Sequence, residues 1–193
     1  MSKACYQVSW GLLLILIDIR IEFFDLLPDI LGYILLLAGF NRLKQENRYF
    51  EIGNKAGWLV MIVSIIQFLT TFGQQPSSMY SFGDMTLMEA AMQIVSLIGN
   101  MILGYCICKG IECRAEGLKQ TVLKQAAQTR LRFFLIIQLM WLIVMPFSLN
   151  LDQDIMIPIL FALGIAVIIS WLSIVLLARA AGRLWKDRPA IAL

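Results

Sequence analysis

Carboxylate side chains gather in one short stretch of this otherwise apolar chain. Asp18, Glu22, Asp25 and Asp29 fall within twelve residues, together with the single cation Arg20, and strongly apolar runs flank them on both sides. Ionisable groups at membrane depth bind ions or substrates, or pair with one another. The stretch therefore has two interpretations: a binding site for a small cation or cationic solute, or a hairpin turn clamped by charge.

A second polar stripe is expected on a helix over 86–108. Glu89, Gln93, Ser96 and Asn100 follow one another at spacings of four, three and four residues, which places them on one face of an α-helix. Polar groups inside a membrane face the protein interior or water. The stripe is therefore either a set of interhelical hydrogen bonds or part of a hydrated pathway. A shorter stripe of the same kind is formed by Ser64, Gln67 and Thr71.

The composition indicates which elements position these groups. Sixty per cent of the 193 residues are hydrophobic and only 15% are charged, whereas soluble domains average about 45–50% and about 25%. About 20 apolar residues are needed to cross a hydrocarbon core as a helix. The sequence thus predicts an all-α integral membrane bundle of six transmembrane helices, with 1–193 forming a single transmembrane domain. The expected helices are 4–21, 26–43, 57–73, 86–108, 133–149 and 155–178.

The distribution of basic residues predicts the orientation. With the N-terminus in the cytoplasm, Arg20 is the only basic residue in an outside segment, which leaves 15 of the 16 Lys and Arg residues inside. Cytoplasmic loops carry this kind of excess. Both termini are therefore expected in the cytoplasm.

Imposing this topology on the carboxylate stretch gives its members separate roles. Asp25 suits the N-cap of the helix 26–43, and Pro28 in the first turn removes no helical hydrogen bond. Asp29 follows near the positive end of the helix dipole, which favours its ionised form. Asp18 lies about one turn inside the outer boundary of the first helix. Asp18 and Asp29 are therefore expected at similar depth on neighbouring antiparallel helices.

The longest cytoplasmic segment, 109–132, is basic and is expected to be partly helical. Its apolar residues recur at helical spacing beside Lys119, Lys124 and Arg130. One interpretation is an interfacial helix that rests on anionic lipid, and the other is a docking surface for a cytosolic partner. The apolar residues concerned are Leu118, Val122, Leu123, Ala126 and Ala127.

Several kinds of chemistry are disfavoured. The chain has no histidine, which removes imidazole bases and nearly all mixed Cys/His zinc sites. Cys106, Cys108 and Cys113 lack a fourth ligand and are interpreted as reduced cysteines at the membrane edge. No phosphate-binding loop or hydrolase motif is found. We therefore expect no cofactor, no metal and no nucleic-acid partner, and an enzymatic role is not favoured.

The stretch 18–33 resembles an uncharacterised family of small multi-pass membrane proteins from Gram-positive bacteria. The resemblance rests on Asp-Ile-Arg-Ile at 18–21 and on the motif Asp-Leu-Leu-Pro-Asp-x-x-Gly-Tyr at 25–33. It implies a multi-pass protein of the bacterial plasma membrane. It implies no reaction.

Three functional classes remain open. The first is a small transporter or channel-like protein with an outward-facing acidic and polar site. The second is a non-catalytic scaffold or regulator that acts through 109–132, and the third is a lipid-processing enzyme in which Asp18 and Asp29 hold a metal. The expected partners are membrane lipids, a small cation or cationic solute, a second copy of the chain, or another membrane or cytosolic protein. The residues expected at the outward site are Asp18, Arg20, Glu22, Asp25, Asp29, Glu89, Gln93 and Asn100.

Overall fold

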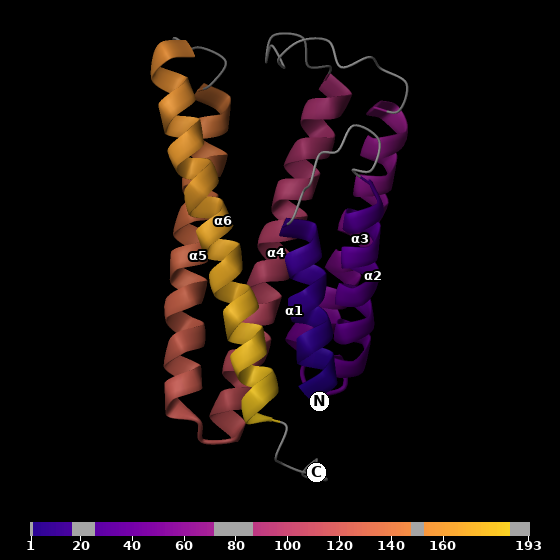
Figure 1. Ribbon diagram of the computed structural model, residues 1–193, viewed down its shortest axis with the longest axis vertical. Helices are drawn as coiled ribbons and strands as arrows, with labels where there is room; N and C mark the ends of the chain where they lie inside the picture. Colours follow the sequence, from indigo (N-terminus) through magenta and orange to yellow (C-terminus); the bar gives the residue numbers. More distant parts are fainter. Residues whose placement is uncertain (1, 17–25, 72–86, 148–152, 186–193) are drawn as a thin grey trace.

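Six helices form a closed ring in the computed structural model, which describes residues 2–16, 26–71, 87–147 and 153–185. Each helix packs on the next along the chain, α6 packs on α1, and α4 also contacts α6. Both ends of the chain lie at the same end of the bundle (Figure 1). The helices are α1 (Ser2–Leu16), α2 (Leu26–Leu43), α3 (Arg48–Thr71), α4 (Leu87–Gly117), α5 (Thr121–Phe147) and α6 (Gln153–Leu184).

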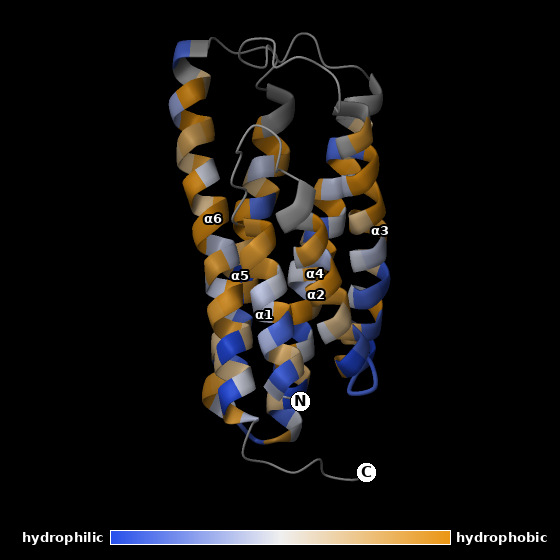
Figure 2. Cartoon of the chain, turned by 45° about the vertical axis from the view of Figure 1, so that its right-hand side comes forward, coloured by the Kyte–Doolittle hydropathy of each residue, from blue (hydrophilic) through white to orange (hydrophobic). Residues whose placement is uncertain are grey.

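Four of these helices are long and apolar enough to cross a membrane. The spans are 48–67 in α3, 91–117 in α4, 121–144 in α5 and 156–184 in α6, and α2 contains a shorter apolar helix at 30–43. Figure 2 shows apolar residues along most of α5 and α6, while hydrophilic residues gather mainly toward the end where the termini lie. The predicted all-α, membrane-type fold is confirmed.

The bounds of α2 match the prediction, whereas α3 begins at Arg48 rather than at 57. The cap explains the earlier start. The side-chain oxygen of Asn47 accepts a hydrogen bond from the backbone N–H of Phe50 (3.2 Å), and its amide donates to the carbonyl of Gly110 (2.9 Å). Asn is a favoured N-cap residue because it satisfies an N–H left free by the first helical turn. Residues 48–56, which include the charged Arg48, Glu51 and Lys55, therefore form the first turns of α3. They are not a loop.

The segment 109–132 is helical over most of its length, in line with the prediction, but its helical residues belong to α4 and α5. Helix α4 continues to Gly117 instead of ending at 108, and α5 begins at Thr121 instead of 133. Leu123, Ala127 and Leu131 are buried in the bundle core, which fixes this part of α5 against its neighbours. The remaining predicted bounds differ less: α1 is described over 2–16 against 4–21, and α6 spans 153–184 against 155–178.

A three-residue turn, 118–120, joins α4 to α5 through an unfavourable residue. The N–H of Gln120 donates to the carbonyl of Ala115 (2.8 Å), and that of Lys119 donates to the carbonyl of Glu116 (3.0 Å). This pair of bonds defines a Schellman motif, in which the residue at Lys119 adopts the left-handed conformation and is usually glycine. Lys119 has a φ of 56°.

Lys119→Gly is expected to stabilise the protein by about 1 kcal/mol, because glycine adopts left-handed φ values without steric cost. Denaturation of the purified protein in mixed micelles measures the change. Lys119→Ala is the matched control, because it removes the charge and keeps the strained Cβ. Equal gains in both variants would show that charge, and not conformation, is responsible.

The first two helices touch through their backbones. A Cβ added at Gly11 of α1 would lie 2.6 Å from the carbonyl oxygen of Gly32 and 2.7 Å from the backbone nitrogen of Leu36. One added at Gly39 of α2 would lie 2.9 Å from the carbonyl oxygen of Ala4. Small residues at helix interfaces allow such close approach in membrane proteins. The α1–α2 hairpin is thus held by contact between small residues seven positions apart on each helix.

Candidate functional site

The structure describes only part of the predicted outward site. Asp29 lies in the first turn of α2 and Glu89 in the first turn of α4, but their side chains are outside the described part of the chain. The placement of Asp18 and Asp29 at similar depth on neighbouring helices is therefore still a prediction. The remaining acidic-stretch residues fall outside the described residues altogether: Asp18, Arg20, Glu22 and Asp25.

The described part of the α4 polar stripe continues the core-facing side of the helix. Glu89, Gln93, Ser96 and Asn100 share one continuous helix, as predicted. The same face continues toward the C-terminal end of α4 with residues at three- and four-residue spacing, all of them in the buried core. Those core residues are Leu103, Ile107 and Ile111. At this spacing Ser96 and Asn100 fall on the same side of α4 as these core residues.

Exposure changes abruptly along this face. Leu103 and Ile107 are 1% exposed, whereas Ser96 and Asn100 are half-buried and Gln93 is exposed. A polar residue on the inward face of a packed bundle would be buried if neighbouring helices covered it. The outer part of the α4 stripe is therefore accessible, and the inner part of the same face is closed.

The neighbouring helix α3 presents polar groups on the matching side. Val60 packs against Gly99 of α4, and Ser64 and Gln67 follow Val60 at spacings of four and three residues. Both side chains are half-buried. The shorter stripe and the α4 stripe thus approach the same interface from two helices, which the sequence alone does not indicate.

Three phenylalanines close the bundle below Asn100, and we call them the phenylalanine seal: Phe40, Phe50 and Phe134. Each ring fits against a glycine, so that Phe134 packs on Gly104, one turn below Asn100. The Phe40 and Phe50 rings are in contact, with centroids 6.2 Å apart. All three rings are at most 1% exposed. Together with Leu103 and Ile107, these rings belong to the buried apolar core between the polar stripe and the end of the bundle where the described chain begins and ends.

The basic end of the bundle is held by ion pairs, which the sequence did not reveal. Glu112 of α4 forms an ion pair with Lys109 (2.8 Å) and accepts a hydrogen bond from the side-chain amide of Gln128 of α5 (2.8 Å). Lys124 of α5 pairs with Glu116 of α4 (2.7 Å). The contacts of Gln128 with Glu112 and of Lys124 with Glu116 hold the start of α5 against the end of α4. Two of the six Lys and Arg residues of 109–132 are thus paired with the two carboxylates of the same segment.

Arg114 joins three separate elements at this end. Its guanidinium pairs with Glu46 in the turn between α2 and α3, and it lies over the ring of Trp185, 5.0 Å from the centroid. The Trp185 indole N–H in turn donates to the side-chain oxygen of Gln120 (3.3 Å). Cation–π contact with tryptophan is the strongest of its kind. Trp185, which directly follows α6, is thereby anchored beside the α4–α5 turn.

Metal chemistry finds no support in the described residues, where no cluster of three or more Cys, Asp or Glu side chains is placed to hold an ion. Cys5, Cys106 and Cys108 are buried free thiols, and Cys113 is exposed. No protein-family model, curated protein or solved structure matches the chain.

Proposed function

We propose that this chain is a small transporter or channel-like protein of the plasma membrane, which crosses the bilayer six times with both termini in the cytoplasm. Its outward half holds an acidic and polar site for a small cation or cationic solute. The observation that carries this proposal is the inward face of α4, which is polar and accessible from Gln93 to Asn100 and apolar and closed from Leu103 onward. A path open on one side of a seal is the arrangement expected of an outward-facing state.

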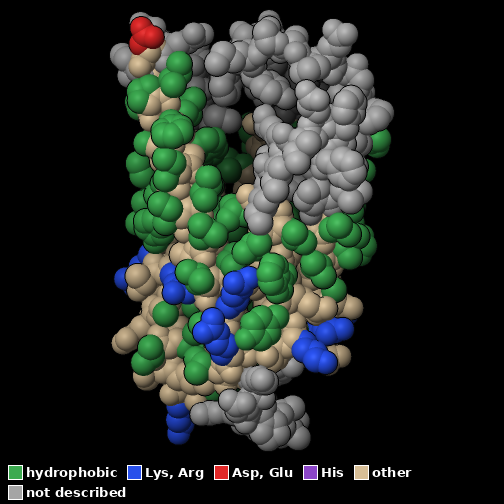
Figure 3. Space-filling view, viewed as in Figure 1, with side chains coloured by type: hydrophobic (Ala, Val, Ile, Leu, Met, Phe, Trp, Pro, Cys, Tyr) green, Lys and Arg blue, Asp and Glu red, His purple; other side chains and the backbone are tan. Residues whose placement is uncertain are grey.

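The distribution of charge supports the orientation. The Lys and Arg side chains visible in Figure 3 lie on its lower half, at the end with the termini, and hydrophobic side chains cover the upper part of α6. The first turn of α6, at the opposite end, carries Asp154. This asymmetry follows the rule that basic residues stay in the cytoplasm.

A regulator that acts through 109–132 is less well supported. That interpretation needs a solvated basic surface, but Lys109, Arg114 and Lys124 are each paired with a carboxylate of the same bundle. These three charges are satisfied within the fold, which leaves Lys119, Arg130 and Arg132 outside the ion pairs of the described residues.

Cysteine accessibility tests the proposed outward path. In a variant whose four native cysteines are replaced, Ser96→Cys is expected to react with a membrane-impermeant maleimide added from outside, because thiolates form only where water reaches. Ile98→Cys is the matched control. It lies at the same depth and is 47% exposed, but on a face that the proposal assigns to lipid, so it should remain unlabelled.

A second control addresses the seal. Ile107→Cys lies on the same face as Ser96, about three turns deeper, and should stay unlabelled from outside. If Ser96→Cys reacts no faster than Ile98→Cys, the stripe is a set of dry interhelical contacts and the outward path does not exist. Labelling of Ser96→Cys only from the cytoplasmic side would reverse the proposed orientation.

A further inference from the structure

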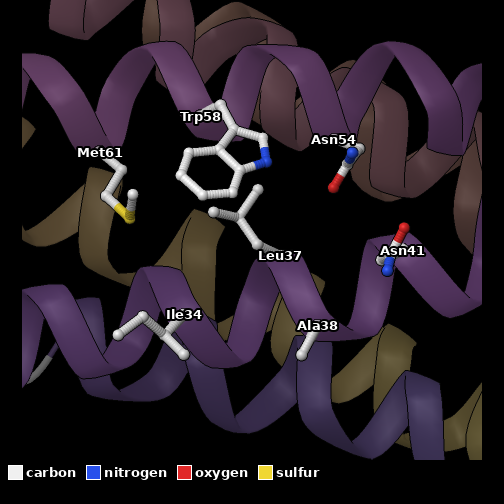
Figure 4. Close-up of a pocket in the computed structure, with 7 residues that line it drawn as sticks. All are labelled: Ile34, Leu37, Ala38, Asn41, Asn54, Trp58 and Met61. Atoms are coloured by element: carbon white, nitrogen blue, oxygen red, sulfur yellow. The ribbon is translucent and has the colours of Figure 1, made fainter.

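The outer side of the α2–α3 pair contains a groove of about 390 Å³ that belongs to no part of the proposed pathway. This volume is within the range of roughly 300–1,000 Å³ typical of small-molecule sites. Figure 4 shows side chains from α2 and α3 turned toward each other across it. The residues used below are Ile34, Leu37, Asn41, Asn54, Trp58 and Met61.

The groove is polar at one end and apolar at the other. Asn41 and Asn54 face each other at the end near the α2–α3 turn, and Ile34 and Met61 lie at the far end (Figure 4). Seven residues separate Asn41 from Ile34, which corresponds to about 10 Å along the helix. The polar end therefore lies at the level where α2 ends and α3 begins, and the apolar end lies deeper along the helices.

The walls leave the groove open to the outside of the bundle. Ile34 is 50% exposed and Trp58 is 51% exposed, whereas Leu37 is 6% exposed and forms the floor. Leu37 reaches this position because it packs against Gly57, where an added Cβ would lie 2.9 Å from the leucine side chain. An occupant would thus bind from the surrounding membrane and would not enter through the bundle interior.

Positive charge borders the polar end. Arg42 lies four residues after the lining residue Ala38 and hence on the same face of α2. Arg42 and Lys44 are exposed, and neither takes part in an ion pair with another described residue. On the α3 side, Lys55 is neutralised by Glu51 (2.8 Å). The border therefore has a net positive charge, contributed by Arg42 at the end of α2 and by Lys44 in the turn that follows.

We infer that this groove binds one anionic phospholipid. An acyl chain occupies the apolar part between Ile34 and Trp58, and the amides of Asn41 and Asn54 donate hydrogen bonds to the ester oxygens. The phosphate lies beside Arg42 and Lys44. Basic residues at the cytoplasmic surface attract anionic lipids. The inference requires that α2 and α3 lie in a membrane, and it does not depend on transport.

Quenching of tryptophan fluorescence by brominated lipids tests the site. The full chain is placed in phosphatidylcholine vesicles that contain either phosphatidylglycerol or phosphatidylcholine with brominated acyl chains. The Trp58 signal is the difference between the wild-type protein and Trp58→Phe. Brominated phosphatidylglycerol is expected to quench it at a lower mole fraction than brominated phosphatidylcholine. The double variant Arg42→Gln/Lys44→Gln should lose about fivefold of this preference per charge removed.

The matched control removes two positive charges at another place on the basic end of the bundle. Lys3→Gln/Arg183→Gln removes two exposed cations from α1 and α6 and should keep the preference. If both double variants lose the preference for phosphatidylglycerol equally, general surface charge causes the preference and the proposed binding site is wrong. Equal quenching of the wild-type protein by both lipids would show non-specific lipid contact only. A Trp58 shielded from both lipids in a dimeric protein would identify a second copy as the occupant.

Discussion

Cation flux into proteoliposomes is expected to fall at least tenfold when Asp29 is replaced by asparagine. The amide keeps the size of the side chain and removes its charge. At 4 Å and an effective dielectric constant near 20, a pair of unit charges interacts by about 4 kcal/mol. A site that relies on this carboxylate therefore loses most of its affinity for a cation. The flux of sodium, potassium, calcium and methylammonium ions, each tested separately, measures the effect.

Asp154→Asn is the matched control for this experiment. Asp154 lies in the first turn of α6 and is exposed, as Asp29 lies in the first turn of α2. Both substitutions remove a charge from the start of a helix, which costs about 0.3–1 kcal/mol in each case. A loss of flux in Asp29→Asn alone would assign it to the site. Flux of no tested ion through the wild-type protein, or unchanged flux in Asp29→Asn, would contradict the proposed acidic site.

Gly11→Leu is expected to separate α1 from α2 and to destabilise the bundle by about 3 kcal/mol or more. Even the first carbon of a side chain would overlap the backbone of α2, at the Gly32 oxygen and the Leu36 nitrogen. Backbone atoms of a packed helix cannot rotate away, so the two helices must move apart. Overpacking of cores typically costs 1–3 kcal/mol, with larger values where the neighbours cannot yield. The denaturant concentration at which half of the protein unfolds in mixed micelles measures this change.

Gly164→Leu on α6 provides the comparison. A Cβ at Gly164 would meet no other atom within 4 Å. In a helix interior leucine is more favourable than glycine by up to about 1 kcal/mol. The control should therefore be as stable as the wild-type protein or slightly more so. If Gly11→Leu unfolds at the same denaturant concentration as Gly164→Leu, the close contact of α1 with α2 does not stabilise the fold.

Hydropathy predicted the membrane-type helices but not where they end. The run 26–43 is bounded by polar residues on both sides, so its apolar limits coincide with those of α2. In α3, α4 and α5 the helix continues past the apolar run. Residues such as Glu51, Glu112 and Lys124 belong to helices and are satisfied by ion pairs between turns or between neighbouring helices. The length of an apolar segment indicates how much of a helix can contact lipid. The helix itself ends where its backbone hydrogen bonds end.

The candidate site could be predicted along single helices but not between them. The spacing of Gln93, Ser96 and Asn100 correctly placed them on one face of α4. Nothing in that spacing indicated that Phe134 and Phe50 would close the bundle just below, because the seal depends on contacts between residues far apart in the sequence. The same holds for Arg114, whose partners come from the α2–α3 turn and the end of α6.

The continuity of α4 through both halves of the bundle has a mechanical consequence. A stiff helix acts as a lever, and the distance from Asn100 to Gly117 is about 25 Å at 1.5 Å per residue. A tilt of about 10° around the level of Asn100 would therefore move the 118–120 turn sideways by about 4 Å. Only three residues connect α4 to α5, so the position of this turn changes when either helix tilts. A spectroscopic label at Lys119 would follow movements deep in the membrane without touching them.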